Sequence, residues 1–129
     1  MNYRNTLRAA GIFGALGVGF GAFGAHGLRE TLLEHGMANA WETAVRYHLF
    51  HALGLLVISF WFRQNDSRDI SLFTWVARSW MIGIILFSGS LYGLALGGPR
   101  WLGPVTPLGG VAFIAGWILL IVAASRKKS

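Results

Sequence analysis

Histidine is the residue type in this chain that could do chemistry most readily, because imidazole titrates near neutral pH and binds metals and haem. His48 and His51 stand three residues apart in one apolar stretch, and His26 closes another. Two ligands at this spacing could belong to a metal or haem site, but such a site needs a third or fourth ligand. The chain has no cysteine and no HExxH motif. A metal or haem site through His48 and His51 is therefore the weakest interpretation; hydrogen bonding inside the fold is the simplest, and binding of a proton or small polar ligand lies between them.

Ser88, Tyr92 and Thr106 are the other polar side chains of interest. Ser88 and Tyr92 lie in the apolar stretch FSGSLYGLAL, where a serine usually bonds to a carbonyl one turn earlier or to a neighbouring helix. No histidine or carboxylate stands beside the serine at the spacing that activates a nucleophile. We therefore predict no enzyme, no metal and no cofactor. The candidates for a polar or ligand-binding site are His26, His48, His51, Ser88, Tyr92 and Thr106.

The composition indicates which class of protein must hold these side chains. Of the 129 residues, 54% are hydrophobic and 12% are charged, which lies outside the range of ordinary soluble domains. The basic residues, which give a net charge of +6, stand at the ends of apolar runs, where they would meet lipid head groups rather than nucleic acid. We expect residues 1–129 to form a single integral membrane domain, with the lipid bilayer and not nucleic acid as its surroundings.

Four apolar segments have about the length of roughly 20 residues that a helix needs to cross a bilayer. They cover residues 7–25, 45–62, 73–96 and 108–124. Between the first two, GLRETLLEHG has the pattern of a short amphipathic helix on the membrane surface, which Gly36 would end. Thr106 is placed to cap the fourth helix, with Pro107 at its first position. The predicted fold is all-α, a polytopic membrane protein with four transmembrane helices and a short amphipathic helix between the first and second.

Lysine and arginine are distributed unequally between the two ends of these helices. Eight lie on the side of the chain termini and three on the other side. Because cytoplasmic loops retain lysine and arginine, this asymmetry predicts that both termini are cytoplasmic. Arg4 and Arg8 before the first apolar segment also fit a secretory signal peptide, an interpretation that we do not favour.

Small residues follow one face of the first helix. At about 100° per residue, five glycines fall within an arc of roughly 140°, and bulky side chains project from the opposite side; they are Gly11, Gly14, Gly17, Gly21 and Gly24. Because lipid is as apolar as leucine, membrane helices associate through close packing, which small residues allow. The third helix carries GxxxG pairs that end at Gly97. The predicted packing residues are Gly14, Gly17, Gly21, Gly24, Gly89 and Gly93. We expect them to support a homo-oligomer or a contact with a membrane-protein partner.

Four stretches occur in the order GAFGAHGL, WETAVRYHLFHALGLL, LFSGSLYGLAL and GPVTPLGG. With them the chain resembles, from about residue 7 to residue 124, the small bacterial inner-membrane proteins grouped as domain of unknown function 423, which are related to the eukaryotic transmembrane protein 256. The resemblance implies a four-helix fold in the bacterial cytoplasmic membrane and implies no reaction. His48 stands where that family often has glutamine, which argues against a metal at this position.

Two classes of function fit these observations. The preferred hypothesis is a structural or interaction subunit without a catalytic site, which self-associates or joins a larger membrane complex. The glycine face and the lack of a catalytic constellation motivate it. The alternative is an oligomeric small transporter or channel, because four short helices alone enclose little volume. Its polar path would be lined by His26, His51, Ser88 and Tyr92.

Overall fold

The computed structural model describes residues 1–64 and 69–127, and every regular element in these residues is a helix. The elements are α1 (Tyr3–Ala25), α2 (Arg29–Glu34), α3 (Ala38–Gln64), α4 (Ile70–Gly83), the π-helical turn η1 (Ile84–Ser88), α5 (Gly89–Ala95) and α6 (Leu102–Ser125). The elements α4, η1 and α5 form one continuous helix, Ile70–Ala95. With it, the described residues contain four helices that are long and apolar enough to span a membrane, as the sequence predicts.

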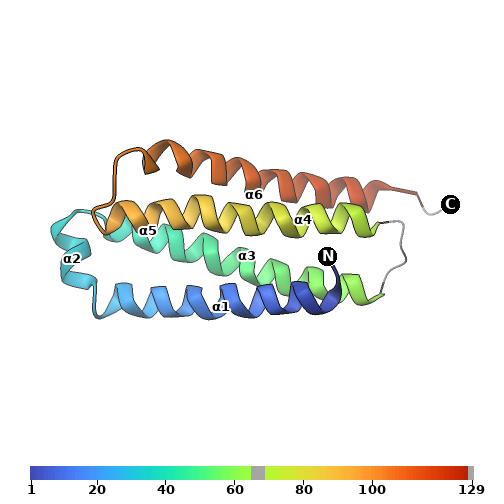
Figure 1. The fold of residues 1–129 in the computed structure, drawn as a ribbon, viewed down its shortest axis with the longest axis horizontal. Helices are drawn as coiled ribbons and strands as arrows, with labels where there is room; N and C mark the ends of the chain where they lie inside the picture. The colour runs from blue at the N-terminus through green and yellow to red at the C-terminus, as the bar shows by residue number, and fades with distance from the viewer. Residues whose placement is uncertain (65–68, 128–129) are drawn as a thin grey trace.

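The helices lie side by side in a bundle (Figure 1). The helix α1 lies along α3, and the continuous helix α4–η1–α5 lies between α3 and α6, so that α1 and α6 flank the bundle on opposite sides. The N-terminus, the end of α3, the start of α4 and the end of α6 lie toward one end of the bundle, whereas α2 and the α5–α6 connection lie at the other (Figure 1). This is the up-and-down order that short connections between neighbouring helices produce.

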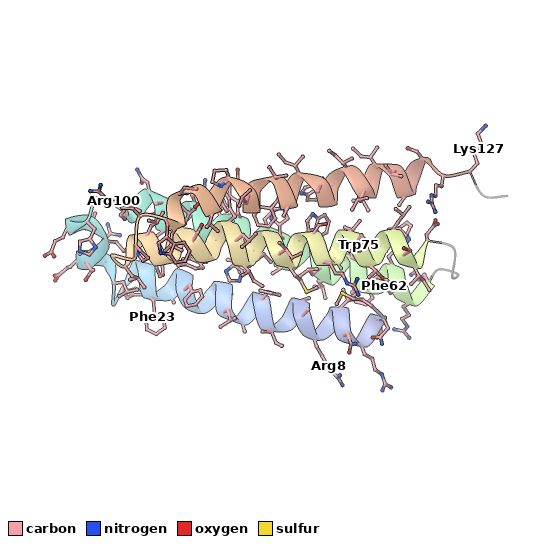
Figure 2. All side chains as sticks on the ribbon, turned by 45° about the horizontal axis from the view of Figure 1, so that its top comes forward. Arg8, Phe23, Phe62, Trp75, Arg100 and Lys127 are labelled. Carbon is pink, nitrogen blue, oxygen red and sulfur yellow. The ribbon has the colours of Figure 1, made fainter. Side chains whose placement is uncertain are left out.

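The outer surface of the long helices is apolar. Ile12 and Phe23 are each 60% exposed, and Phe23 projects away from the bundle (Figure 2). Acyl chains cover such a surface in a bilayer, whereas in water it would promote aggregation. Charged groups lie toward the ends: Arg8 and Lys127 lie toward the end with the termini, and Arg100 lies at the end with α2 (Figure 2). This sorting fits a hydrocarbon core, since a charge at its centre is costly.

The core is built around Trp80 of α4, whose side chain is 1% exposed. Its indole meets α3 at Gly54 and α6 at Gly116, and a Cβ atom at either glycine would collide with the ring. Leu55 and Val76 are fully buried in the same cluster. Two glycines thus let one large ring pack closely against three helices at once.

The π-helical turn η1 determines which side chains the continuous helix presents to its neighbours. The N–H of Gly89 donates to the carbonyl of Ile84, one residue further back than in an α-helix. Ser88 and Tyr92 bond to α3, whereas Ser90 bonds to α6. The turn therefore lies where one helix must satisfy polar groups on two sides.

The start of α6 differs from the prediction. The helix begins at Leu102, so that Thr106 lies inside it, and the predicted cap at Thr106 is wrong. The helix begins earlier because the N–H groups of Leu102 and Gly103 donate to the carbonyls of Pro99 and Arg100, at 3.1 and 3.0 Å. This turn nucleates the helix, and the hydroxyl of Thr106 is left to bond sideways.

The helix α2 is the short amphipathic helix that the sequence predicts, and it packs onto the end of the bundle. Leu32 is 2% exposed and belongs to the same apolar cluster as Trp41. His35 caps the helix, and its Nδ1 lies 3.2 Å from the carbonyl oxygen of Ala95. Gly36 then has a φ of 64°, a left-handed conformation that glycine adopts without strain. Thus α2 closes one end of the bundle instead of only resting on the membrane surface.

Candidate functional site

His48 and Tyr92 form a hydrogen-bonded pair inside the bundle. The Nδ1 of His48 on α3 lies 2.9 Å from the hydroxyl of Tyr92 on α5, and the two side chains are 2% and 8% exposed. The rings of Phe13 and Phe20 on α1 lie beside the imidazole, at centroid distances of 6.1 and 6.3 Å. The Nε2 of His48 is buried beside the backbone of Phe13, without a hydrogen bond of good geometry in the described part of the chain. One nitrogen of this ring is therefore held by a tyrosine, and the other is enclosed against α1.

His51 lies one turn further along α3 and bonds to α6 instead. Its Nδ1 lies 2.8 Å from the carbonyl oxygen of Tyr47, and the indole N–H of Trp117 donates to its Nε2 at 3.0 Å. Because an indole N–H can only donate, Nε2 must accept, and the neutral tautomer with its proton on Nδ1 satisfies both bonds. The imidazole also stacks on Phe113, with 3.8 Å between ring centroids. Both nitrogens of His51 are therefore occupied by hydrogen bonds.

The buried hydroxyl groups connect other pairs of helices. The Oγ of Ser88 donates to the carbonyl of Ala44 on α3 at 2.7 Å. The Oγ of Ser90 and the Oγ1 of Thr106 are 2.5 Å apart and connect α5 with α6. Each hydroxyl is used in a bond between helices, which is the usual role of serine and threonine inside a membrane bundle.

The six candidate residues do not form one site. Three of them gather between α3 and the continuous helix: His48, Ser88 and Tyr92. His51 and Thr106 bond to other partners, and His26 is exposed at the end of α1. Within residues 1–64 and 69–127, no group of three or more His, Cys, Asp or Glu side chains could hold a metal ion. The residues that are brought together therefore form interhelical bonds and no metal-ligand set.

Three of the predicted α1 glycines pack against α3. A Cβ atom at Gly17 or Gly24 would collide with an α3 side chain, and one at Gly21 would lie 3.2 Å from another. The α3 side chains in these contacts are Leu49, Trp41 and Val45. A Cβ atom at Gly14 would meet nothing within 4 Å, so Gly14 does not pack within this chain, and its packing against another chain stays a prediction.

The GxxxG repeat of the third helix is largely not a packing surface in this chain. A Cβ atom at Gly89 would meet nothing within 4 Å, and Gly97 lies beyond the end of α5 with a φ of 89°. Gly93 has a close neighbour, because a Cβ atom there would lie 2.7 Å from a methyl group of Leu102. Residue spacing alone does not show which side of a helix meets a neighbour in the same chain; for Gly89, packing against another chain stays a prediction.

Sequence reasoning missed one close approach between helix backbones, at Gly109. A Cβ atom at Gly109 of α6 would collide with the backbone of Phe87 in η1, and one at Gly83 would collide with the ring of Phe113. Neither glycine belongs to a GxxxG pair. The available signal was the combination of aromatic residues and scattered glycines in the last two membrane segments, which predicts that rings pack against glycines but not which ones meet.

An open groove runs along the lipid-facing side of α1 and α3. The groove has two parts, of which the first is apolar and has a volume of about 520 Å³. This apolar part is lined by Leu7, Ala10, Gly11, Gly14, Val18, Leu49, Ala52, Leu53 and Leu56. Cβ atoms at Gly11 and Gly14 would meet nothing within 4 Å. This part of the groove is therefore open because α1 has no side chains there.

The same two helices border a second cavity at the end of the bundle that carries α2. Its volume is about 490 Å³, and it is lined by Gly21, Gly24, Ala25, Arg29, Leu32, Leu33, Ala38, Asn39, Trp41, Glu42, Val45 and Arg46. Gly21 lies within one turn of Val18, and Val45 within about one turn of Leu49, so this cavity follows the apolar part along one face. We term the two together the α1–α3 groove, with an apolar part and a polar end.

A third cavity, of about 390 Å³, opens beside His51. It is lined by Arg46, Tyr47, Phe50, His51 and Trp117. Neither Ser88 nor Tyr92 lines any of these three cavities. The cavities therefore do not connect the residues expected along a polar transport path.

Comparison with known proteins reveals close relatives. The family model described as protein of unknown function DUF423 matches residues 20–110. The UPF0382 membrane protein YwdK of Bacillus subtilis is 48% identical over 111 residues, which cover 86% of this chain and 88% of the relative. A UPF0382 membrane protein of Staphylococcus epidermidis is 47% identical over 119 residues, covering 89% of this chain and 93% of the relative.

A third relative covers almost the whole chain. The UPF0382 inner membrane protein YgdD of Escherichia coli K12 is 42% identical over 130 residues, which cover 99% of this chain and 95% of the relative. No solved structure matches the chain significantly. All three relatives are named membrane proteins, in agreement with four helices of bilayer length. The chain thus belongs to the family described as protein of unknown function DUF423 and is a polytopic membrane protein.

Proposed function

We propose that this protein is a non-catalytic interaction protein of the bacterial inner membrane, and that the α1–α3 groove is the surface that binds its partner. The observation that carries the proposal is the open space at Gly11 and Gly14, in a helix whose glycines Gly17 and Gly24 are filled by α3 side chains. An unfilled hollow beside a helix loses the dispersion contacts of its walls. A partner that fills the hollow recovers those contacts.

The use of polar groups in the interior supports a role without catalysis. Nucleophilic catalysis needs a hydroxyl or thiol beside a base that is free to take its proton. Here Ser88 donates to a backbone carbonyl, and Ser90 is paired with Thr106. His51 is a candidate base, but both of its nitrogens already form hydrogen bonds, one with the indole of Trp117 and one with the carbonyl of Tyr47. These groups stabilise the bundle, and among residues 1–64 and 69–127 no specific contact favours a transport path.

We also infer that this protein lies in the inner membrane, as the name of the Escherichia coli relative states for that protein, and that both of its termini are cytoplasmic. The end of the bundle with the termini carries Arg4, Arg8, Arg63, Arg126 and Lys127. The other end carries Arg29, Arg46 and Arg100, together with Glu30, Glu34 and Glu42. Because lysine and arginine mark cytoplasmic ends, this charge asymmetry supports the orientation.

The substitution Gly14→Ile tests the proposed binding surface, because it fills the apolar part without entering the α1–α3 contact. Gly89→Ile is the matched control, since that glycine is equally open but lies on α5. Native mass spectrometry of protein extracted in mild detergent measures the mass that stays bound without a covalent bond. We expect the unchanged protein and Gly89→Ile to keep a defined additional mass, and Gly14→Ile to lose it. Identical spectra from all three proteins, with equal helix content by circular dichroism, would rule out the groove as the binding surface.

A further inference from the structure

We propose that the polar end of the α1–α3 groove binds the phosphate ester head group of an anionic phospholipid, whose acyl chain occupies the apolar part. This inference rests on the proposed function and names the partner of that surface. Three observations lead to it: the charged side chains at the polar end, the position of the two cavities one after the other along the same face of α1 and α3, and the length of the groove.

Two arginines from different helices border the polar end. Arg29 is the first residue of α2, and Arg46 lies about two turns into α3. Both side chains are exposed, and neither forms a hydrogen bond or an ion pair with another residue in the described ranges 1–64 and 69–127. A guanidinium offers parallel N–H donors that match the oxygens of a phosphate. The polar end therefore presents two unused anion-binding groups on one cavity.

The third charged side chain of the polar end limits which anion fits. Glu42 lines the same cavity, so the charged side chains carry a net charge of +1. This charge complements a phosphodiester with a single negative charge better than a phosphate dianion. Asn39, also in the lining, supplies an amide that can donate to or accept from head-group hydroxyls. The best match is a head group such as that of phosphatidylglycerol.

The apolar part indicates that the phosphate belongs to a lipid. From Gly24 to Leu7, the lining residue of α1 farthest from α2, α1 rises by about 25 Å, most of a hydrocarbon core about 30 Å thick. The groove therefore runs from the head-group level past the middle of the bilayer, so an acyl chain that covers one leaflet fits within its length. A soluble phosphate ester would leave the walls at Gly11 and Gly14 uncovered. A lipid satisfies both parts at once.

The experiment compares Arg29→Gln and Arg46→Gln with the control Arg100→Gln, which removes an exposed arginine at the same end of the bundle but outside the three cavities. Each purified protein receives phosphatidylglycerol, phosphatidylethanolamine, glycerol 3-phosphate or inorganic phosphate. Native mass spectrometry measures retained lipid, and thermal unfolding measures stabilisation. We expect the unchanged protein and Arg100→Gln to retain phosphatidylglycerol, and each groove variant to retain about fivefold less, because one arginine near a lipid surface contributes about 1 kcal/mol.

The remaining outcomes separate the possible occupants. Equal retention of phosphatidylglycerol by Arg29→Gln, Arg46→Gln and the unchanged protein would overturn the proposal. Equal stabilisation by glycerol 3-phosphate and phosphatidylglycerol would overturn the assignment to a lipid. A bound mass equal to a second copy, lost in Gly14→Ile, would overturn the lipid and leave the proposed function intact; such a copy could bring Glu30 or Glu34 to the arginines. If native mass spectrometry showed no bound mass that the unchanged protein retains and Gly14→Ile loses, both the lipid site and the proposed function would be contradicted.

Discussion

The two buried histidines are held by different neighbours, and those neighbours limit what each ring can do. His51 accepts from the indole of Trp117 and donates to the carbonyl of Tyr47, so it connects α3 with α6. His48 bonds to Tyr92 and connects α3 with α5. A hydrogen bond between membrane helices contributes about 0.6 kcal/mol on average and at most about 1.7 kcal/mol. The histidines are therefore modest but specific connections between helices.

The bond between His51 and Trp117 can be tested by a double-mutant cycle. His51→Phe retains an aromatic ring against Phe113 but leaves the Trp117 N–H without its acceptor. We expect this variant to lower the free energy of unfolding by about 0.6–1.7 kcal/mol, the range for a hydrogen bond between membrane helices. Reversible unfolding in mixed detergent micelles measures the change for His51→Phe, Trp117→Phe and the double variant. If the two single losses simply add in the double variant, the two side chains are not coupled as the structure shows.

The partners of the buried polar groups were only partly predictable from the sequence. The apolar surroundings of His48 and Ser88 predict internal hydrogen bonds, and both side chains form them, with Tyr92 and with the carbonyl of Ala44. Trp117 stands 66 residues from His51, and no local pattern links the two. Such a pair arises from the packing of α3 against α6, which depends on where large rings meet glycines.

Glycines have two different roles at the scale of helices. Gly54, Gly109 and Gly116 allow close contact between helices of the chain, because a Cβ atom at any of them would collide with a neighbour. Gly11 and Gly14 have no such neighbour and leave the α1–α3 groove open. The same residue type therefore builds the inside of the bundle and shapes its outside.

These two roles predict opposite effects of adding one methyl group. Gly109→Ala places a Cβ atom against the backbone of Phe87, which cannot move without shifting η1, so we expect a loss of stability of about 1–3 kcal/mol. Gly89→Ala adds the same group in open space, where alanine is a better helix former by up to about 1 kcal/mol. Unfolding in mixed micelles compares the two variants. A Gly109→Ala protein as stable as Gly89→Ala would show that the α6 contact with η1 is not close.

The helices themselves were more predictable than their contacts. Hydropathy predicted four membrane segments and the amphipathic helix α2, because lipid imposes both length and composition on a spanning helix. It did not predict the start of α6 at Leu102, where a turn through Pro99 begins the helix early. Nor did it predict the turn η1, because a π-helical turn depends on contacts with two neighbouring helices.

The whole molecule has two ends that differ in charge. The end with the termini carries arginine and lysine with few acidic residues, whereas the end with α2 carries three arginines and three glutamates. An uneven distribution of this kind orients a membrane protein during insertion. The polar end of the α1–α3 groove would then face away from the cytoplasm.

Cysteine labelling tests this orientation directly, because the natural chain has no cysteine. Glu34→Cys places a thiol at the end of α2, and Gln64→Cys places one at the end of α3; both positions are exposed. We expect a membrane-impermeant maleimide to label Glu34→Cys in intact spheroplasts and to label Gln64→Cys only after the membrane is opened. The reverse pattern would place the termini outside the cytoplasm.

The α1–α3 groove is the proposed binding surface, so the molecule that occupies it is the partner of this protein. A crystal structure grown from a lipidic mesophase that contains phosphatidylglycerol would show the occupant most directly. We expect elongated density along the groove, with the phosphate between Arg29 and Arg46 and an acyl chain over Gly14. A helix of a second copy in the groove, or α1 closed onto α3 so that Gly11 and Gly14 touch α3 side chains, would contradict lipid binding at this surface.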